Sequence, residues 1–271
     1  MVLILPGVPA PFDAPTVDLS AFRPASEPLG GVRTLLGRLT GSYSAAEILT
    51  IRRVYALLEE AGLLGQLDTL SFKLNNAADS LLNWVGPDSA TNNGATFGGD
   101  GFAFDGVNDW IDPNFDLSGD GNFKANNAFA GAYVTRDGGG ASVRVLGTVD
   151  EVGELSHLHP RFLTSNTGFR LNSSATTSVP MVRPDIRGLW SLGNLVDAGD
   201  DMTYVFYGSS PVASAEVTFT TIPNSLIIGR NATLYSDLSV SGWFAGAYVL
   251  GAQRPVLAKA FEIMNATFVS E

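Results

Sequence analysis

The stretch Gly98–Asp112, GGDGFAFDGVNDWID, decides the fold that this sequence predicts. Its first half alternates aromatic and small or polar residues, with Phe102 and Phe104 two positions apart. Asp105-Gly106 follows, and then a second alternating run. An Asp-Gly pair between two runs of period-two apolar residues indicates a β-hairpin, because glycine readily adopts the positive φ of a tight turn. We therefore expect two paired strands here, within a mainly β protein.

A second landmark lies near the other end of the chain. Leu226–Arg230, LIIGR, precedes Gly242–Leu250, GWFAGAYVL, and Pro255–Val269 then places apolar residues at helical spacing. Together with the Gly-rich lead and the Phe-Asp-Gly turn, this order resembles the opening and closing segments of concanavalin A-like and laminin G-like jelly rolls. The resemblance implies a concanavalin A-like jelly-roll β-sandwich over residues 67–271, with a short C-terminal helix.

Between the two landmarks, short apolar runs alternate with turn signals at the spacing of a sandwich. Gly138–Gly140, Asp197–Asp201 and Pro223-Asn224 are such signals, because Gly, Pro, Asn and Asp favour turns. We expect strands at 69–74, 128–135, 142–148, 157–163, 168–172, 186–193, 203–208, 215–220, 225–229 and 242–250.

Composition limits the classes of function. Of 271 residues, 45% are hydrophobic and only 16% are charged, against about 25% charged in an average protein. Such a charge-poor surface suits an all-β protein held in an assembly. The net charge of −11, without a long basic run, argues against nucleic acid and anionic membranes, because both need clustered Lys and Arg. Cysteine is absent, which excludes disulfides and thiol chemistry.

The N-terminal residues predict neither a signal peptide nor membrane insertion. MVLILPG has no basic n-region, and Pro6 ends its apolar run early. No stretch reaches the roughly 18 apolar residues of a membrane helix.

Residues 1–43 are not typical of a folded domain. Prolines recur at positions 6, 9, 11, 15, 24 and 28, which favours an extended, largely unpaired path. One alternative is a disordered tail. The segment is more apolar than such tails usually are, and we favour an extended arm that attaches to a neighbouring subunit.

The region 44–66 is expected to be a helix or neck. Ser44 and Glu47 form a capping box, and Ile48, Ile51 and Tyr55 begin an apolar stripe at helical spacing. The helix should run from about 44 to 61. Its broad stripe fits packing on the protein's own sheet, and it also fits a self-associating dimeric or trimeric neck.

Several short motifs resemble the C-terminal region of proteins from tailed-phage and prophage structural operons. In that pattern a helix is followed by Leu-Asp-x-Leu, Asn-Trp, Thr-Phe, the Gly-Phe-x-x-Asp-Gly turn, Asn-Phe-Asp and Phe-x-x-Asn-Asn-Ala. The matching segments here are Leu67–Leu70, Asn83-Trp84, Thr96-Phe97, Gly101–Gly106, Asn114–Asp116 and Phe123–Ala128. The resemblance implies a virion protein made in the host cytoplasm.

No motif predicts catalysis. Glycoside hydrolysis needs two carboxylates about 5–9.5 Å apart, and the jelly-roll glycosidases resemble Glu-x-Asp-x-x-Glu on one strand. The nearest match, Asp150–Glu154, has the wrong spacing and a glycine break. We therefore expect no enzyme. His157 and His159 would lie on one side of a strand, as metal ligands or as a pair on a solvated or interface face.

A loop and two turns supply the candidate ligand residues. Asp116, Asp120 and Asn122 offer hard oxygens in a Gly-containing loop, and laminin G-like domains often hold calcium at the sandwich rim. A solvated turn is the alternative, and no other cofactor is expected. Sugar-binding candidates are Asn108, Asp109, Trp110 and Asn231. Trp190, Trp243 and Tyr248, like Trp110, could also stack on sugar rings, but at strand spacing most of these aromatic residues fit core positions.

The resulting hypothesis is a structural and adhesive virion protein of a tailed phage: a fibre, spike or tail-tip component. Its jelly roll would face outward and bind host surface polysaccharide. Residues 1–43 would attach it to other virion proteins, and the chain would form a homo-oligomer, with a trimer preferred. The alternatives are a stand-alone lectin module and a polysaccharide depolymerase.

Overall fold

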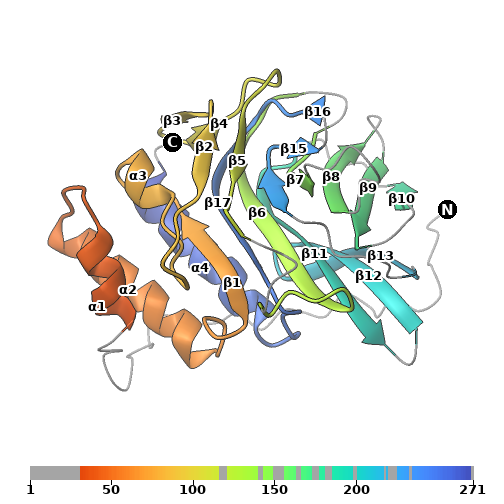
Figure 1. Ribbon diagram of the computed structural model, residues 1–271, viewed down its shortest axis with the longest axis horizontal. Coiled ribbons are helices and arrows are strands. Elements are labelled where there is room, and N and C mark those ends of the chain that lie inside the picture. The colour runs from red at the N-terminus through yellow and green to blue at the C-terminus, as the bar shows by residue number, and fades with distance from the viewer. Residues whose placement is uncertain are drawn as a thin grey trace.

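The computed structural model describes residues 31–115, 121–139, 143–148, 156–162, 166–172, 177–180, 185–197, 200–216, 218, 225–231 and 234–269. Within them, two antiparallel sheets lie face to face, and helices cover the outer face of the larger sheet (Figure 1). The expected mainly β sandwich with a C-terminal helix is confirmed.

The larger sheet contains eight strands of the described chain, in the order β13-β12-β11-β6-β17-β4-β3, and β1 also pairs with β17. β4 pairs with the first part of β17, and β1 pairs with the last part of β17. Both strands therefore lie along the same side of β17, opposite β6. The strands span Ser210–Glu216 (β13), Asp200–Tyr207 (β12), Gly188–Asp197 (β11), Asn127–Asp137 (β6), Leu238–Gly246 (β17), Gly101–Ala103 (β4), Thr96–Gly98 (β3) and Leu67–Phe72 (β1).

The smaller sheet has the order β10-β9-β8-β7-β14-β5-β2. A separate two-stranded hairpin, β15-β16, follows β14. These strands span Thr177–Pro180 (β10), Asn166–Leu171 (β9), Ser156–Phe162 (β8), Leu146–Thr148 (β7), Leu226–Ile228 (β14), Trp110–Asp112 (β5), Thr91–Asn93 (β2), Arg230–Asn231 (β15) and Leu234–Tyr235 (β16).

The expected hairpin across Asp105-Gly106 is wrong. β4 belongs to the larger sheet and β5 to the smaller one, so this stretch carries the chain from one sheet to the other. The Asp105 carboxylate accepts hydrogen bonds from the Val107 and Asn108 amides at 2.7 and 3.1 Å, which makes the turn wider than a two-residue hairpin turn. Phe104 stays buried in the core between the sheets.

Small residues on β6 make room for two large side chains in the core. Ala132 lies opposite both Trp190 on β11 and Trp243 on β17. Both indoles are buried, as expected from their strand positions, and each contributes about 5 kcal/mol of hydrophobic stabilisation. The Trp190 Nε1–H donates to the Ile186 carbonyl at 2.7 Å, which satisfies its polar atom.

The helical layer consists of α1, α2 and α4, while α3 is a single turn beside β1 (Figure 1). The Ser44–Glu47 capping box is present at the start of α2. Ile51 and Leu58 on α2 pack in one buried cluster with Phe261 on α4. This is the intrachain packing alternative, since the apolar face of α2 is covered within the chain. The helices span Gly31–Arg38 (α1), Ala45–Glu60 (α2), Ala77–Ser80 (α3) and Arg254–Phe268 (α4).

Residues 31–38 form α1 instead of continuing the extended arm expected over 1–43. Val32 and Leu35 are buried in the cluster beneath the helices, so apolar contacts stabilise this short helix. Residues 1–30 of the expected arm lie outside the described residues.

Arg38, at the end of α1, fastens the helical layer to a loop of the sandwich. Its guanidinium donates to four backbone carbonyls at 2.7–3.0 Å. One planar group with several donors therefore holds a whole turn of the chain in place. The acceptors are the carbonyls of Asn83, Gly86, Pro87 and Asp88.

The buried carboxylate of Asp79 holds the loop between α1 and α2. It accepts hydrogen bonds from the Thr40 and Gly41 amides at 2.9 Å and from the Tyr43 hydroxyl at 2.6 Å. The Thr40 hydroxyl and the side-chain amide of Asn76 donate two more. Burial alone would raise the pKa of Asp79, but these hydrogen bonds outweigh it and lower the pKa below its ordinary value.

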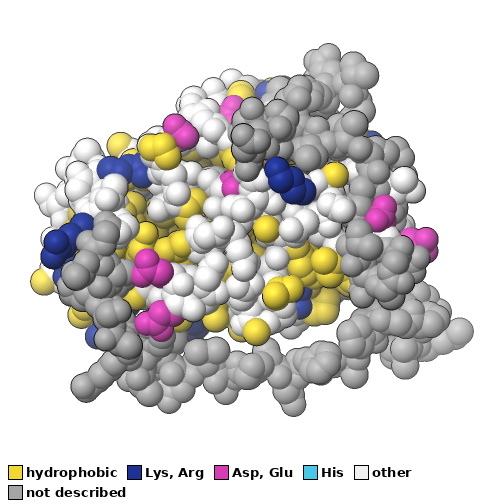
Figure 2. All heavy atoms as spheres, turned by 60° about the horizontal axis from the view of Figure 1, so that its bottom comes forward, with side chains coloured by type: hydrophobic (Ala, Val, Ile, Leu, Met, Phe, Trp, Pro, Cys, Tyr) yellow, Lys and Arg dark blue, Asp and Glu magenta, His cyan; other side chains and the backbone are white. Residues whose placement is uncertain are grey.

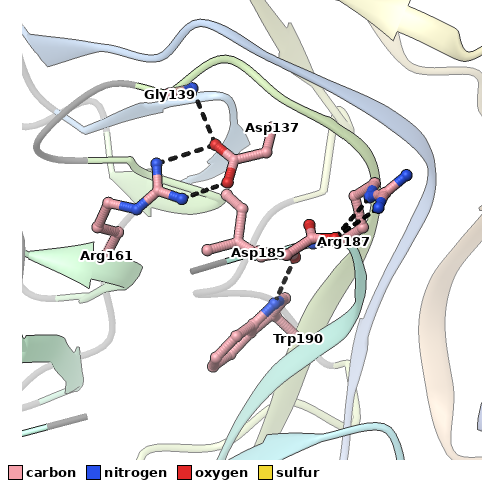
Figure 3. A network of polar contacts seen from close by, with 7 residues as sticks. Asp137, Gly139, Arg161, Asp185, Arg187 and Trp190 are labelled. Carbon is pink, nitrogen blue, oxygen red and sulfur yellow. Dashed lines mark hydrogen bonds and ion pairs between the residues drawn. The ribbon is translucent and has the colours of Figure 1, made fainter. Parts of the chain in front are cut away.

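A second polar contact, between half-buried side chains, ties the two sheets together at one end of the sandwich (Figure 3). Arg161 on β8 forms an ion pair with Asp137 on β6, and the Gly139 amide donates to the same carboxylate at 2.9 Å. Burial raises the pKa of Asp137, but the hydrogen bonds and the charge of Arg161 outweigh it and lower the pKa overall. The pair fixes the position of β8 relative to β6.

The surface agrees with the low content of charged residues. On the described part of the face drawn in Figure 2, a few charged side chains are scattered among hydrophobic side chains and uncharged atoms. Among the described residues, no helix combines the length and the apolar character needed to cross a membrane.

We predict that Asp79→Asn lowers the free energy of unfolding by about 3 kcal/mol at neutral pH, because several buried donors lose their charged acceptor. A carboxyl group whose pKa is lowered on folding stabilises the fold at pH values above its unfolded-state pKa of about 3.9. This stabilisation is lost as the pH falls through the lowered, folded-state pKa. The wild type should therefore lose stability below about pH 4, and the variant less steeply. Urea unfolding at several pH values measures both effects.

The matched control is Asp88→Asn, which changes an exposed carboxylate and should shift stability by less than about 0.5 kcal/mol. Equal unfolding midpoints for wild type and Asp79→Asn would show that the carboxylate does not hold the loop.

Candidate functional site

The candidate site lies where the 105–110 turn meets the β15-β16 hairpin, and we call this surface the rim site. Gly106, at φ +77°, packs so closely on Asp237 that a Cβ there would lie 3.4 Å from the Asp237 Cβ. The Ser236 amide donates to the Gly229 carbonyl at 3.0 Å and closes the hairpin. Two segments about 120 residues apart in sequence thus form one surface.

Arg230 is the centre of the rim site. Its guanidinium carbon lies 5.2 Å from the centroid of the Trp110 ring and 5.1 Å from that of Tyr235. Both distances are within the reach of a cation–π interaction, worth about 0.5–1 kcal/mol at a partly exposed position. All three side chains are half-buried. The two rings therefore hold the cation at the surface of the molecule.

Strand pairing explains how these side chains meet. Arg230 and Tyr235 are directly paired across the hairpin, so their side chains share one face of it. Trp110 begins β5, which pairs with β14 through Ile111 and Ile228. The hairpin starts two residues after Ile228, and this places Arg230 over the indole.

Gly229 is required for this geometry. Its φ is +82°, in the region that favours glycine, and a Cβ would lie 2.9 Å from three atoms of the Phe104 ring. Its amide donates to the Val145 carbonyl at 3.0 Å. The chain therefore bends sharply between β14 and the hairpin, directly above a core aromatic residue.

The other sugar-binding candidates have different surroundings. Asn108 is exposed in the turn, whereas the side chain of Asp109 is buried. The Asp109 carboxylate accepts from the Asp105 amide at 3.2 Å. Burial, and then the nearby Asp105 carboxylate, raise the pKa of Asp109. Asp109 therefore supports the turn. Asn231 lies in β15, and its side chain is outside the described residues.

The candidate calcium loop is only partly described. Asp116 and Asp120 lie outside the described residues, so calcium binding stays a prediction. The Asn122 amide and side chain both donate to the Asp68 carboxylate, at 2.8 and 3.0 Å. The Phe123 amide donates to the other Asp68 oxygen at 2.8 Å. The structure thus places Asn122 on Asp68, which orders this end of the loop.

His157 and His159 lie on the same side of β8, as their spacing predicts, with ring centroids 4.5 Å apart. Both are almost fully buried and not on a solvated face. Burial, and then the charges of Arg170 and Arg144, lower the pKa of His157 to about 3. The pKa of His159 is also lowered, first by burial. Among the described residues, no three His, Asp or Glu side chains form a group with metal-site geometry.

Of the three side chains that contact one another at the rim site, sequence reasoning found Trp110 but missed Arg230 and Tyr235. Arg230 lay within the LIIGR segment, which served only to identify the fold. A signal was present: a glycine and then an arginine directly follow an apolar strand, and an aromatic residue comes five positions after the arginine. Only the pairing of the hairpin shows that these residues contact Trp110.

The two facing antiparallel sheets define a β-sandwich of the jelly-roll type. Comparison with solved structures supports this fold. No protein-family model and no curated protein sequence matches the chain. Among solved structures, the chain is similar to a Trypanosoma rangeli sialidase mutant with trans-sialidase activity, with a TM-score of 0.55, 15% identity, and coverage of 81% of this chain and 40% of that chain.

Two further structures have the same kind of similarity. The T. rangeli sialidase in complex with sialic acid matches with a TM-score of 0.53 and 13% identity, over 84% of this chain and 40% of that chain. The receptor-binding domain of botulinum neurotoxin C/D mosaic serotype matches with a TM-score of 0.50 and 6% identity, over 72% of this chain and 51% of that chain. At these identities the similarity concerns the fold.

The comparison contradicts the expectation that the chain is not an enzyme, because several of the similar structures are sialidases, which are glycoside hydrolases. The expectation relied on the absence of a linear carboxylate motif. Catalytic carboxylates need only converge in space and can come from different strands, so sequence spacing was a poor guide. This chain spans about 40% of the length of the sialidases. Asp150–Glu154 lies outside the described residues.

We predict that Gly229→Ala destabilises the protein by about 3 kcal/mol, the sum of backbone strain at positive φ and the overlap with the Phe104 ring. The matched control is Gly208→Ala. Gly208 also has a positive φ, of +60°, but a Cβ at this position would have no neighbouring atom within 4 Å, and this change should cost only about 1 kcal/mol. Urea unfolding compares the two, and equal costs would contradict the packing argument.

Proposed function

We propose that this chain is a glycan-binding β-sandwich domain with an adhesive role. The observation that carries the proposal is the rim site, where Trp110 and Tyr235 hold the Arg230 guanidinium at the surface beside the exposed Asn108. Sugars present hydroxyl groups and apolar ring faces, and sites that bind them combine aromatic side chains with a few well-placed polar groups.

The position of the rim site supports this proposal. The helices cover the outer face of the larger sheet, whereas Trp110, Arg230 and Tyr235 at the rim are only half-buried. Loops on a rigid scaffold commonly carry binding residues. The similar structures include a sialidase in complex with sialic acid and a receptor-binding domain. They support the proposal at the level of the fold alone.

The finer proposal is that the domain belongs to a virion protein of a tailed phage, as a fibre, spike or tail-tip component that meets host polysaccharide. It is supported by the phage-type motifs between Leu67 and Ala128 and by the order of N-terminal segment, helix and sandwich. Residues 1–30, which precede α1, would connect it to other virion proteins. A lectin module without a virion role is the alternative.

We predict that the full chain binds glycans on an array and that Trp110→Ala lowers the affinity at least about tenfold, because Trp110 both faces the ligand and supports Arg230. The matched control is Leu49→Ala. Leu49 is 47% exposed on α2, in the helical layer, and its loss should leave binding unchanged. Analysis of the bound glycans for cleavage products in the same experiment tests hydrolysis.

Two results would contradict the glycan-binding proposal: no array glycan bound by the wild type, or equal binding by the wild type and Trp110→Ala. A melting temperature measured for each variant separates loss of binding from loss of fold.

We further expect the full chain to be a trimer in solution, since a virion fibre or spike would be an obligate oligomer. Light scattering coupled to size exclusion measures the mass, which should be three times that of the 28.6 kDa chain. A monomer at micromolar concentration would favour the lectin alternative over the virion one.

A further inference from the structure

We propose that the chain has a second ligand-binding site, at the start of α4, where the Arg254 guanidinium binds the carboxylate of an acidic sugar. This surface is called the α4 site and consists of Tyr204, Phe206, Tyr248 and Arg254. The inference rests on the proposed glycan-binding function for the kind of ligand, but none of these residues belongs to the rim site. Three features lead to it: the aromatic surface beneath the cation, the donors of the cation that have no acceptor, and the turn that holds the cation.

The aromatic side chains of the α4 site lie on the outer face of the larger sheet. Tyr204 and Phe206 on β12 face the helix side, whereas Val205 between them faces the core between the sheets. The centroid of the Tyr248 ring lies 6.5 Å from those of Tyr204 and Phe206. The helices lie over the β1 side of this sheet, and β12 lies toward the opposite edge (Figure 1). Because Tyr204 and Tyr248 are only half-buried, they offer a ligand an aromatic surface.

Arg254 lies on this aromatic surface as a cation without a carboxylate partner. Its guanidinium carbon is 4.3 Å from the centroid of the Phe206 ring and 6.0 Å from that of Tyr248, and its Nη1 donates to the Tyr248 hydroxyl at 3.0 Å. These contacts position the charge but do not neutralise it. Within the described part of the chain, no carboxylate forms an ion pair with Arg254, although acidic residues outnumber basic ones by 27 to 16.

Two donors on one edge of the Arg254 guanidinium have no acceptor among the described residues. They are the Nε, which is buried, and the Nη2. The N–H groups of such an edge match the oxygens of a carboxylate. Arg187 uses the same edge, since its Nε and Nη2 donate to the Asp185 carboxylate at 2.8 and 2.6 Å (Figure 3). A buried donor without an acceptor lowers stability, and a bound carboxylate would provide the missing acceptor.

The turn before α4 fixes the position of Arg254. The Gln253 and Arg254 amides donate to the Leu250 carbonyl at 2.9 and 3.2 Å, and the Gln253 side chain donates to the Ala61 carbonyl at 2.8 Å. Gly251 in the same turn is exposed, and a Cβ there would lie 3.5 Å from the Arg254 Nη2. Because glycine has no side chain, this position leaves room for a ligand beside the guanidinium. The first turn of α4 contains no acidic residue that would repel a carboxylate.

The combination of a fixed cation and tyrosine rings favours an acidic sugar as the ligand. Aromatic rings pack on the apolar face of a sugar, and the guanidinium pairs with its carboxylate. Arg254 keeps its charge at every accessible pH. The net charge of −11 repels anions at long range. An anion that also packs on the rings therefore has an advantage over a small free anion, which makes only the charged contact.

The test is an array of matched pairs, in which each carboxylated glycan stands beside the same glycan after its carboxyl groups are reduced to alcohols. We expect the wild-type full chain to bind at least one carboxylated member about 10- to 100-fold more tightly than its reduced partner, because the reduced form cannot make the charged pair with Arg254. Sulfated glycans on the same array test the competing anion.

Two variants assign the preference to the α4 site. Gly251→Leu places a side chain beside the Arg254 Nη2 and should lower the preference about tenfold. Gly251 has no positive φ, so its backbone accepts a side chain. The matched control is Gly37→Leu on α1, where a Cβ would meet no atom within 4 Å, and it should leave the preference intact. Arg254→Lys should also weaken the preference, because lysine keeps the charge but lacks the planar pair of donors. The rim site is unchanged in all three variants, so neutral glycans should bind them as they bind the wild type.

The outcomes separate the two proposals. The α4 site is overturned, while glycan binding stands, if the reduced glycans bind as tightly as the carboxylated ones, if only sulfated glycans bind, or if Gly251→Leu keeps the full preference. If no glycan of any form binds, the proposed function itself fails. A melting temperature for each variant separates loss of binding from loss of fold. Should Arg254→Lys not fold, Gly251→Leu still decides the question, because it leaves Arg254 and its aromatic contacts in place.

Discussion

Burial of the larger sheet on both faces is the constraint on which the rest of this structure depends. Every residue of β17 is buried, with Trp243 facing the core between the sheets and Phe244 facing the helices. A sheet with two apolar faces needs two covering layers. The second sheet provides one of them. The other comes from α1 and α2 before the sandwich in sequence and from α4 after it, so the two ends of the described chain complete the same core.

This layering also bears on where the proposed binding site lies. The helices occupy the outer face of the larger sheet, and Arg38 and Asp79 fasten them there through hydrogen bonds to backbone groups. The proposed site lies at the rim, where the chain crosses between the sheets. Gly229 bends the chain at that point, and the bend sets Arg230 on two aromatic rings. A single backbone conformation thus links the core aromatic Phe104 to the chemistry at the surface.

Sequence reasoning succeeded where the signal was local. The capping box and the apolar stripe predicted α2, and the strand spacing of Trp190 and Trp243 predicted that both lie in the core. Sequence reasoning failed where the strands or side chains that contact each other lie far apart in sequence. The Asp105-Gly106 turn joins two sheets, because the strands on either side pair with β17 and β14 and not with each other. The site had no linear motif either, since Trp110 and Arg230 meet only through strand pairing.

The sequence by itself determined the class of fold, the positions of α2 and α4 and the burial of Trp190 and Trp243, because these follow from hydrophobic periodicity and turn chemistry. Tertiary structure alone decided which face of the larger sheet the helices cover, that α2 packs within the chain, and that Arg230 becomes the centre of the rim site. Each of these depends on contacts between segments far apart in sequence, whose pairing no local pattern specifies.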